Sequence, residues 1–93
     1  MKKGDTIYLL IEEWHKQTNG EPQLCWYNTS NTLYSNKEDV VSDVTGLIAD
    51  CLNRGESGFN IIETHMDITY TQKEYCGKDN LRRKFIIKKM RLF

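Results

Sequence analysis

The sequence lacks the features that mark several classes of protein. Its 93 residues include one proline and six glycines, which is too few for a disordered or low-complexity chain. No apolar run approaches the ~18 residues that a membrane-spanning helix needs. The run at residues 7–11 is too short for a signal peptide, and "EEW" follows it at once. We therefore expect one small domain that does not enter a membrane and stays in the cytoplasm.

Cysteine and histidine are also scarce. Cys25, Cys51 and Cys76 are odd in number and include no CxxC pair, so we expect reduced, partly buried thiols rather than a disulfide framework. The chain has two histidines and no nucleophile turn such as G-x-S-x-G. We therefore expect no enzyme, no catalytic residues, and no metal or other cofactor.

The charges are balanced in number but unevenly placed. The net charge is zero, and the isoelectric point is about 6.7. Residues 36–70 hold seven acidic and two basic residues, whereas residues 71–93 hold eight basic and two acidic ones. An acidic middle and a basic end can serve a partner, or each other within the fold or across a dimer.

The first third of the chain predicts a β-hairpin. Residues 5–14, "DTIYLLIEEW", are rich in β-branched and aromatic residues, and "TNGEP" follows at residues 18–22. Asn-Gly between two apolar runs is a strong hairpin signal. Residues 23–34 then predict the returning strand.

The middle of the chain predicts an amphipathic helix. "SNKE" at Ser35 to Glu38 fits a capping box, and Gly55 is a plausible stop. At about 100° per residue the apolar side chains fall on one arc. These residues are Val40, Val41, Val44, Leu47, Ile48, Cys51 and Leu52.

The last third predicts two strands. Residues 59–75 alternate apolar and polar side chains around Ile62, Met66 and Ile68, which favours one long strand. "CGKDN" at residues 76–80 predicts a turn. The final strand places Phe85 and Ile87 on one face, and its alternation slips near Met90, as at a β-bulge.

These elements give the order ββαββ in one domain, residues 1–93. We predict an α+β fold: a two-layer sandwich with a mostly antiparallel, four-stranded sheet and one amphipathic helix on one face. The order of strands stays open between a β-grasp-like arrangement, with the first and last strands side by side, and a meander.

"ETHMD" is the best cluster of site-like residues. On a single strand Glu63, His65 and Asp67 would point to the same side, ~7 Å apart along the chain, where they could bind a metal or move protons. The favoured interpretation is an ordinary solvated strand face.

The C-terminal hairpin is a candidate surface for docking or for nucleic acid. A basic face with aromatic neighbours can track phosphates and stack bases, although the isoelectric point is well below the ~9 expected of a dedicated nucleic-acid domain. Lysine and arginine also guard exposed sheet edges. The basic residues are Lys78, Arg82, Arg83, Lys84, Lys88, Lys89 and Arg91.

The polar side of the helix is the opposite kind of surface. Asp39 and Asp43 repel each other weakly across one turn, and Gly46 weakens the helix by up to ~1 kcal/mol relative to Ala. One interpretation is a solvated face. The other is a docking stripe in which Gly46 allows close approach, while the three carboxylates of Asp39, Asp43 and Asp50 meet Lys or Arg of a partner.

The sequence carries no family signature. A compact domain without a catalytic motif, and with patches of both charge signs, is similar to the small accessory proteins of phages and mobile elements. Such proteins often bind and block a host protein, including CRISPR effectors and other defence factors. The resemblance implies an inhibitor that binds another protein, a host factor.

Two alternatives remain beside that hypothesis. The first is a nucleic-acid-binding protein that uses the basic hairpin. The second is a trap that holds a nucleotide between protomers, with Arg82 and Arg83 on the phosphate and an aromatic ring on the base. The docking stripe also has a self-complementary version, a homodimer in which the acidic helix of one copy meets the basic strand of another.

Overall fold

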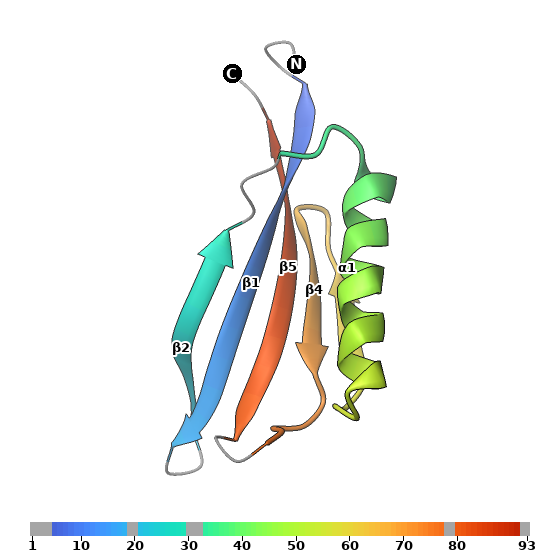
Figure 1. The fold of residues 1–93 in the computed structure, drawn as a ribbon. Coiled ribbons are helices and arrows are strands. Elements are labelled where there is room, and N and C mark those ends of the chain that lie inside the picture. The colour runs from blue at the N-terminus through green and yellow to red at the C-terminus, as the bar shows by residue number, and fades with distance from the viewer. Residues whose placement is uncertain (1–4, 19–20, 30–32, 78–79, 92–93) are drawn as a thin grey trace.

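The computed structural model describes residues 5–18, 21–29, 33–77 and 80–91, with the backbone alone for residues 18 and 21–29. Within these residues the chain forms a five-stranded sheet and one helix in two layers (Figure 1). The elements are β1 (Thr6–Thr18), β2 (Glu21–Thr29), α1 (Lys37–Asn53), β3 (Phe59–Glu63), β4 (Asp67–Gln72) and β5 (Leu81–Arg91). The predicted α+β fold, an antiparallel sheet with one helix on one face, is confirmed.

The first and last strands lie side by side at the centre of the sheet. The strand order is β2-β1-β5-β4-β3, and every neighbouring pair is antiparallel. Residues 6–16 of β1 pair with residues 91–81 of β5 without a break. Of the two arrangements left open by the sequence, the one with adjacent terminal strands is therefore found.

The first hairpin is confirmed, but the predicted bulge is in the wrong place. β1 and β2 pair from Thr18 and Glu21 onward, while the turn residues Asn19 and Gly20 lie outside the described part of the chain. The register shifts between Trp14 and His15. Near Met90, in contrast, the β1–β5 register is continuous through Arg91, so the predicted bulge is not found there.

The prediction of one long strand over residues 59–75 is wrong. The chain turns at residues 64–66, and β3 and β4 form a hairpin. The Thr64 hydroxyl accepts hydrogen bonds from the backbone N–H groups of Met66 (3.3 Å) and Asp67 (3.2 Å), and it donates to the Asp67 carboxylate (2.9 Å). A side-chain turn of this kind needs neither Gly nor Pro. The sheet consequently has five strands rather than the predicted four.

The N-cap of the helix lies one residue later than predicted. Asn36, not Ser35, is the N-cap, and its side chain accepts from the backbone N–H of Asp39 at 2.9 Å. The capping box of Ser35 and Glu38 is therefore wrong, since Asn fills the same role as well as Ser. The helix ends at Asn53, and Gly55 follows with a φ of 81°, as predicted.

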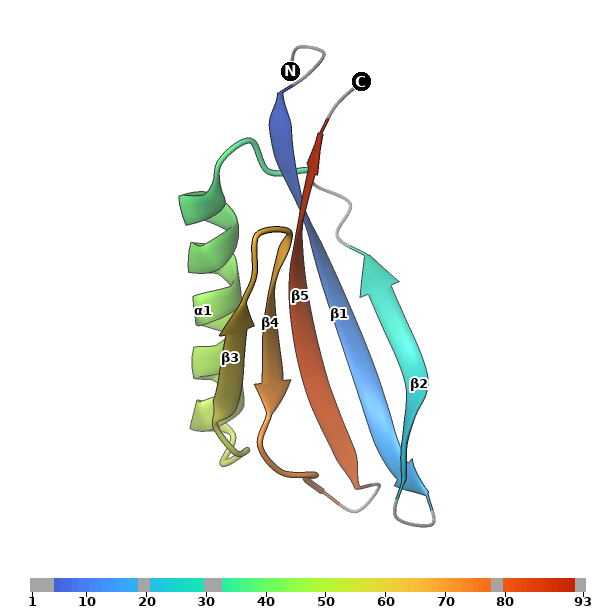
Figure 2. The ribbon, with the colours of Figure 1, turned by 180° about the vertical axis from the view of Figure 1, so that it is seen from behind.

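The core lies between α1 and the central strands. Phe85, Ile87 and Leu10 face the helix, and the Phe85 ring stacks on Phe59 with centroids 5.6 Å apart. Other members of the core are Val40, Val44, Ile68 and Tyr70. The buried stripe of the helix is narrower than the predicted arc, because Leu47 and Leu52 are exposed. Figure 2 shows the opposite face of the sheet, which no described helix covers.

Truncation of Phe85 should remove a large part of the stability. The ring is fully buried, so Phe85→Ala leaves a cavity and should lower the free energy of unfolding by about 3–5 kcal/mol. Urea unfolding followed by circular dichroism measures the change. Leu33 is exposed, and Leu33→Ala should shift the value by at most about 0.5 kcal/mol. Equal effects of the two changes would contradict this placement of the core.

Candidate protein-docking groove

The acidic side of α1 borders an open groove. Asp39, Asp43, Gly46 and Asp50 are all exposed, as the helical pattern predicted. The groove has a volume of about 530 Å³. We call it the acidic groove, and its lining residues are Leu10, Tyr34, Ser42, Asp43, Gly46, Leu47 and Asp50.

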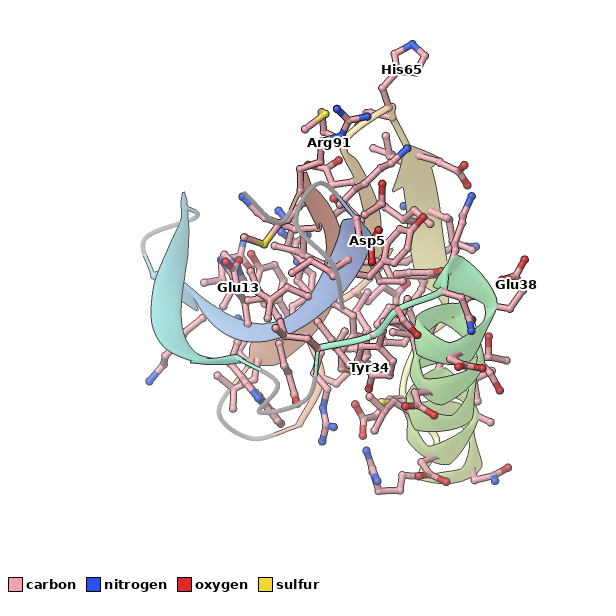
Figure 3. The ribbon with its side chains drawn as sticks, turned by 90° about the horizontal axis from the view of Figure 1, so that it is seen from above. Asp5, Glu13, Tyr34, Glu38, His65 and Arg91 are labelled. Carbon is pink, nitrogen blue, oxygen red and sulfur yellow. The ribbon has the colours of Figure 1, made fainter. Side chains whose placement is uncertain are left out.

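Backbone pairing places Tyr34 in this groove. Tyr34 and Tyr8 form an isolated bridge, with N···O distances of 2.9 and 3.0 Å in the two directions. The bridge holds residue 34 against β1 just before the helix begins. The Tyr34 hydroxyl then donates to the Asp43 carboxylate at 2.8 Å. Figure 3 shows Tyr34 between the sheet and α1, with Glu38 on the other side of the helix.

The carboxylates of the groove form no ion pair with the described residues, and Arg54 acts on Asp50 only from beyond ion-pair distance. Among the described residues, no Lys or Arg lies within 4.0 Å of Asp43 or Asp50. The Tyr34 hydroxyl is neutral, so it orients Asp43 without cancelling its charge. Two negative charges thus stand beside the apolar side chains of Leu10 and Leu47. Asp39 does not line the groove, and its carboxylate accepts a hydrogen bond from the Asn36 amide at 3.0 Å.

Gly46 lines the groove without a side chain. A methyl group built at this position meets nothing within 4 Å, so the packing of this chain does not require glycine there. Because glycine has no side chain, the helix backbone between Asp43 and Asp50 is uncovered at this position.

The basic residues of the C-terminal hairpin do not form one patch. Lys78 lies outside the described residues. On β5 the pairing partners divide the others between the two faces of the sheet. Arg83, Lys89 and Arg91 lie on the face that α1 covers, which we call the helix side. Arg82, Lys84 and Lys88 lie on the opposite face, which no described helix covers and which we call the open side. The alternation predicted for the last strand is thus found, and it divides the basic residues between two faces instead of gathering them on one.

The open face also carries acidic residues next to its basic ones. Lys84 lies opposite Glu13 on β1, and Lys88 lies opposite Asp67 on β4. Opposite charges directly across an antiparallel pair attract each other. His15, opposite Arg82, is 2.9 Å from the Glu13 carboxylate. The described side chains of this face therefore carry charges of both signs, which weakens its case as a phosphate-binding surface.

Arg83 belongs to a polar cluster with Trp14, Glu56 and Gln72, near the start of β5. Its guanidinium lies over the Trp14 ring, 4.1 Å from the centroid, and its Nε is 3.4 Å from the Glu56 carboxylate. The buried Gln72 donates to Glu56 (2.9 Å) and accepts from the backbone N–H of Arg83 (2.8 Å). A space of about 310 Å³ lies beside the cluster. The nucleotide-trap hypothesis needs an arginine for the phosphate and an aromatic ring for the base. In this cluster Arg83 and Trp14 contact each other instead.

The partner of the second arginine is also internal. Arg82 lies over the Tyr75 ring, 4.6 Å from its centroid. The two arginines are on opposite faces of β5, so they do not converge on one phosphate as the nucleotide-trap hypothesis requires.

The "ETHMD" residues do not share a strand face. Glu63 ends β3 and pairs with Lys37 on the helix at 3.0 Å, which raises the pKa of that lysine. His65 lies in the turn and points away from the sheet (Figure 3). Asp67 begins β4 and is bonded to Thr64. The described residues contain no group of His, Cys, Asp and Glu that could hold a metal ion.

The sequence did not reveal Leu10, Tyr34 and Leu47 as parts of the groove. Leu10 and Leu47 carry only the signal of core residues, and Tyr34 reaches Asp43 through a bridge to β1. Such long-range placement leaves no local pattern.

Comparison of the chain with protein-family models, with curated proteins and with solved structures finds no match. Of the described residues, none belongs to a helix with the length and apolar character needed to cross a membrane.

Two glycine substitutions should change stability in opposite directions. Gly46→Ala should raise the free energy of unfolding by up to about 1 kcal/mol, because the methyl group meets no atom and Ala favours the helix. Gly55 has a φ of 81°, so Gly55→Ala should lower it by about 1 kcal/mol. Urea denaturation of both variants measures the two changes in the free energy of unfolding. A destabilising Gly46→Ala would mean that packing requires glycine.

The polar cluster should make stability depend on pH through Glu56. Burial alone would raise the pKa of this carboxyl, but hydrogen bonds from Gln72 and Arg54, together with the charge of Arg83, outweigh it and lower the pKa. A lowered pKa in the folded state stabilises the fold above the unfolded pKa of roughly 4.3. That contribution is lost as the pH falls through the folded pKa.

The variant Glu56→Gln tests this effect. It should be less stable than the natural protein at neutral pH, and the difference should shrink as the pH falls below roughly 4.3. Thermal unfolding over a series of acidic buffers gives both curves. A constant difference at every pH would show that the carboxylate charge contributes nothing.

Proposed function

We propose that the protein is a small, non-enzymatic binding module whose acidic groove takes a basic segment of another protein. The observation that carries the proposal is the pair Asp43 and Asp50. Both are exposed beside an open groove, and neither is paired with a cation of the described chain.

The groove has the chemistry that a Lys or Arg side chain needs. Such a side chain lays its methylene groups along apolar surface and keeps its charged end among polar atoms. Leu10 and Leu47 offer the apolar surface, and the carboxylates of Asp43 and Asp50 offer the acceptors. Tyr34 is an aromatic anchor of the type that is enriched at binding surfaces.

The role that fits this groove is inhibition of a host defence factor. Proteins that hold DNA or RNA, CRISPR effectors among them, expose positively charged channels for phosphates. A small protein with a negative groove can occupy such a channel in place of the nucleic acid. This role agrees with the resemblance to phage and mobile-element accessory proteins, and it places the protein in the cytoplasm.

Nucleic-acid binding is the weaker alternative. Arg82, Lys84 and Lys88 lie on the open face, but Glu13 and Asp67 stand directly opposite two of them. The nucleotide trap is weaker still, because Arg83 is held against Trp14 and Glu56.

Charge reversal in the groove should abolish partner binding. The immobilised protein and the double variant Asp43→Lys with Asp50→Lys are exposed to bacterial extracts, and retained proteins are identified by mass spectrometry. The partner should be retained by the natural protein and lost with the double variant. The purified pair should then bind with an affinity that falls with salt, and DNA or RNA should compete for the partner.

The control is Glu38→Lys, which reverses a charge on the same helix but on the side away from Tyr34 (Figure 3). It should retain the partner, and circular dichroism should show all three proteins folded. Equal retention by every variant would exclude the groove. Binding of labelled DNA or RNA to the protein itself, lost with Lys84→Ala and Lys88→Ala together, would favour the nucleic-acid alternative.

A further inference from the structure

The outer edge of β3 is unguarded. The sheet ends at β3, and no described residue pairs with its outer side. Natural edge strands carry Lys, Pro or a bulge that prevents pairing with other chains. β3 reads "FNIIE" and has neither Lys nor Pro, whereas β2, at the opposite edge of the sheet, contains Pro22. An edge strand without such protection is a template for pairing with another strand.

The hydrogen-bond pattern shows which backbone groups of β3 are available. Gly58 accepts from Lys73 at 2.9 Å, and Thr64 donates to Asp67 at 2.8 Å. In an antiparallel strand the N–H and C=O of one residue point to the same side, and the side alternates along the chain. Asn60 and Ile62 therefore bond to β4, while the backbone groups of Phe59, Ile61 and Glu63 point outward.

We propose that a second copy of this chain pairs with β3, antiparallel and in register about Ile61. Centred there, Ile61 lies opposite itself, and Phe59 of each copy lies opposite Glu63 of the other. Each of these three pairs brings together residues whose N–H and C=O both point outward. A centre moved by one residue, to Asn60 or Ile62, would leave one outward-facing residue of β3 opposite a residue beyond the strand. The symmetric register is thus the one that satisfies every outward group of β3.

The side chains at this edge suit a symmetric contact. Ile61 lies opposite the buried Tyr70, on the helix side of the sheet, yet 61% of its surface is exposed. The Lys37–Glu63 ion pair identifies the side of α1 that faces β3. Val41, Ile48 and Leu52 follow Lys37 on that side at helical spacing, and Leu52 is 50% exposed. Two copies of Ile61 would fill the space between the two helices.

The other face of the edge is also apolar. Ile62 is 64% exposed on the open side of the sheet, and in the symmetric register it lies beside Asn60 of the second copy. Burial of Ile61 and Ile62 of each chain removes apolar surface from water and favours association.

Charge permits the same register. Glu63 is the only charged residue of β3, and in the dimer it lies opposite Phe59 rather than another acid. Its carboxylate is 3.0 Å from Lys37 of its own chain. Like charges opposite each other would oppose pairing, and this register has none. The self-complementarity favours a second copy over an unrelated strand.

The oligomeric state tests the proposal. Sedimentation equilibrium over a range of concentrations should give a mass twice that of one chain, and Ile61→Lys should give the mass of a monomer because it places like charges on the axis. The matched control is Met90→Lys, which changes an exposed apolar residue of β5 away from this edge. It should remain a dimer, and circular dichroism should show each variant folded.

Amide hydrogen exchange locates the contact in the natural protein. The N–H of Ile61 points away from β4, so it should exchange rapidly in the monomer and slowly in the dimer, with protection that rises with protein concentration. The N–H groups of Asn60 and Ile62 should be protected in both states. A monomer at all concentrations, a dimer that survives Ile61→Lys, or an Ile61 amide that exchanges rapidly in the dimer would each overturn the proposal.

Discussion

The rest of the structure depends on the antiparallel pairing of β1 with β5. Eleven consecutive pairs join the two ends of the chain, and their register decides which side chains meet on each face. On the helix side it sets Leu10 beside Ile87, which anchors the core, and Trp14 beside Arg83, which anchors the polar cluster. On the open side it sets Lys84 beside Glu13. A shift of one residue would move every one of these side chains to the wrong face.

The size of the sheet relative to the helix explains the acidic groove. Neighbouring strands are about 4.8 Å apart, whereas a helix with its side chains is about 10–12 Å wide. One helix therefore covers two or three strands of the five, and part of the sheet beside it stays open. The acidic side of α1 borders this open part near Leu10 and Tyr34. The groove is thus a consequence of the fold, and the aspartates give it its chemistry.

The sequence predicted the elements whose signals are local and missed those that depend on distant partners. The helix could be read from its apolar period and from Gly55, and the first hairpin from the apolar runs on both sides of Asn19 and Gly20. The turn at Thr64 could not be predicted, because a threonine side chain forms it inside an uninterrupted alternation of apolar and polar residues. The basic character of β5 was equally visible, but the carboxylates that lie opposite Lys84 and Lys88 come from β1 and β4. Of the acidic groove, the exposed aspartates were predictable and the lining from β1 was not.

The two proposed surfaces lie on opposite sides of α1 and do not compete. The acidic groove is on the side of Asp43 and Tyr34, whereas the pairing edge is on the side of Lys37 and Glu63. In the proposed dimer the two-fold axis through Ile61 runs perpendicular to the sheet, so both helices would lie on the same face of the joined sheet and both grooves would stay open. Such a dimer presents two identical acidic grooves. Against a partner with a repeated basic surface, the second groove binds at the high effective concentration set by the first, and a weak single contact becomes a strong one.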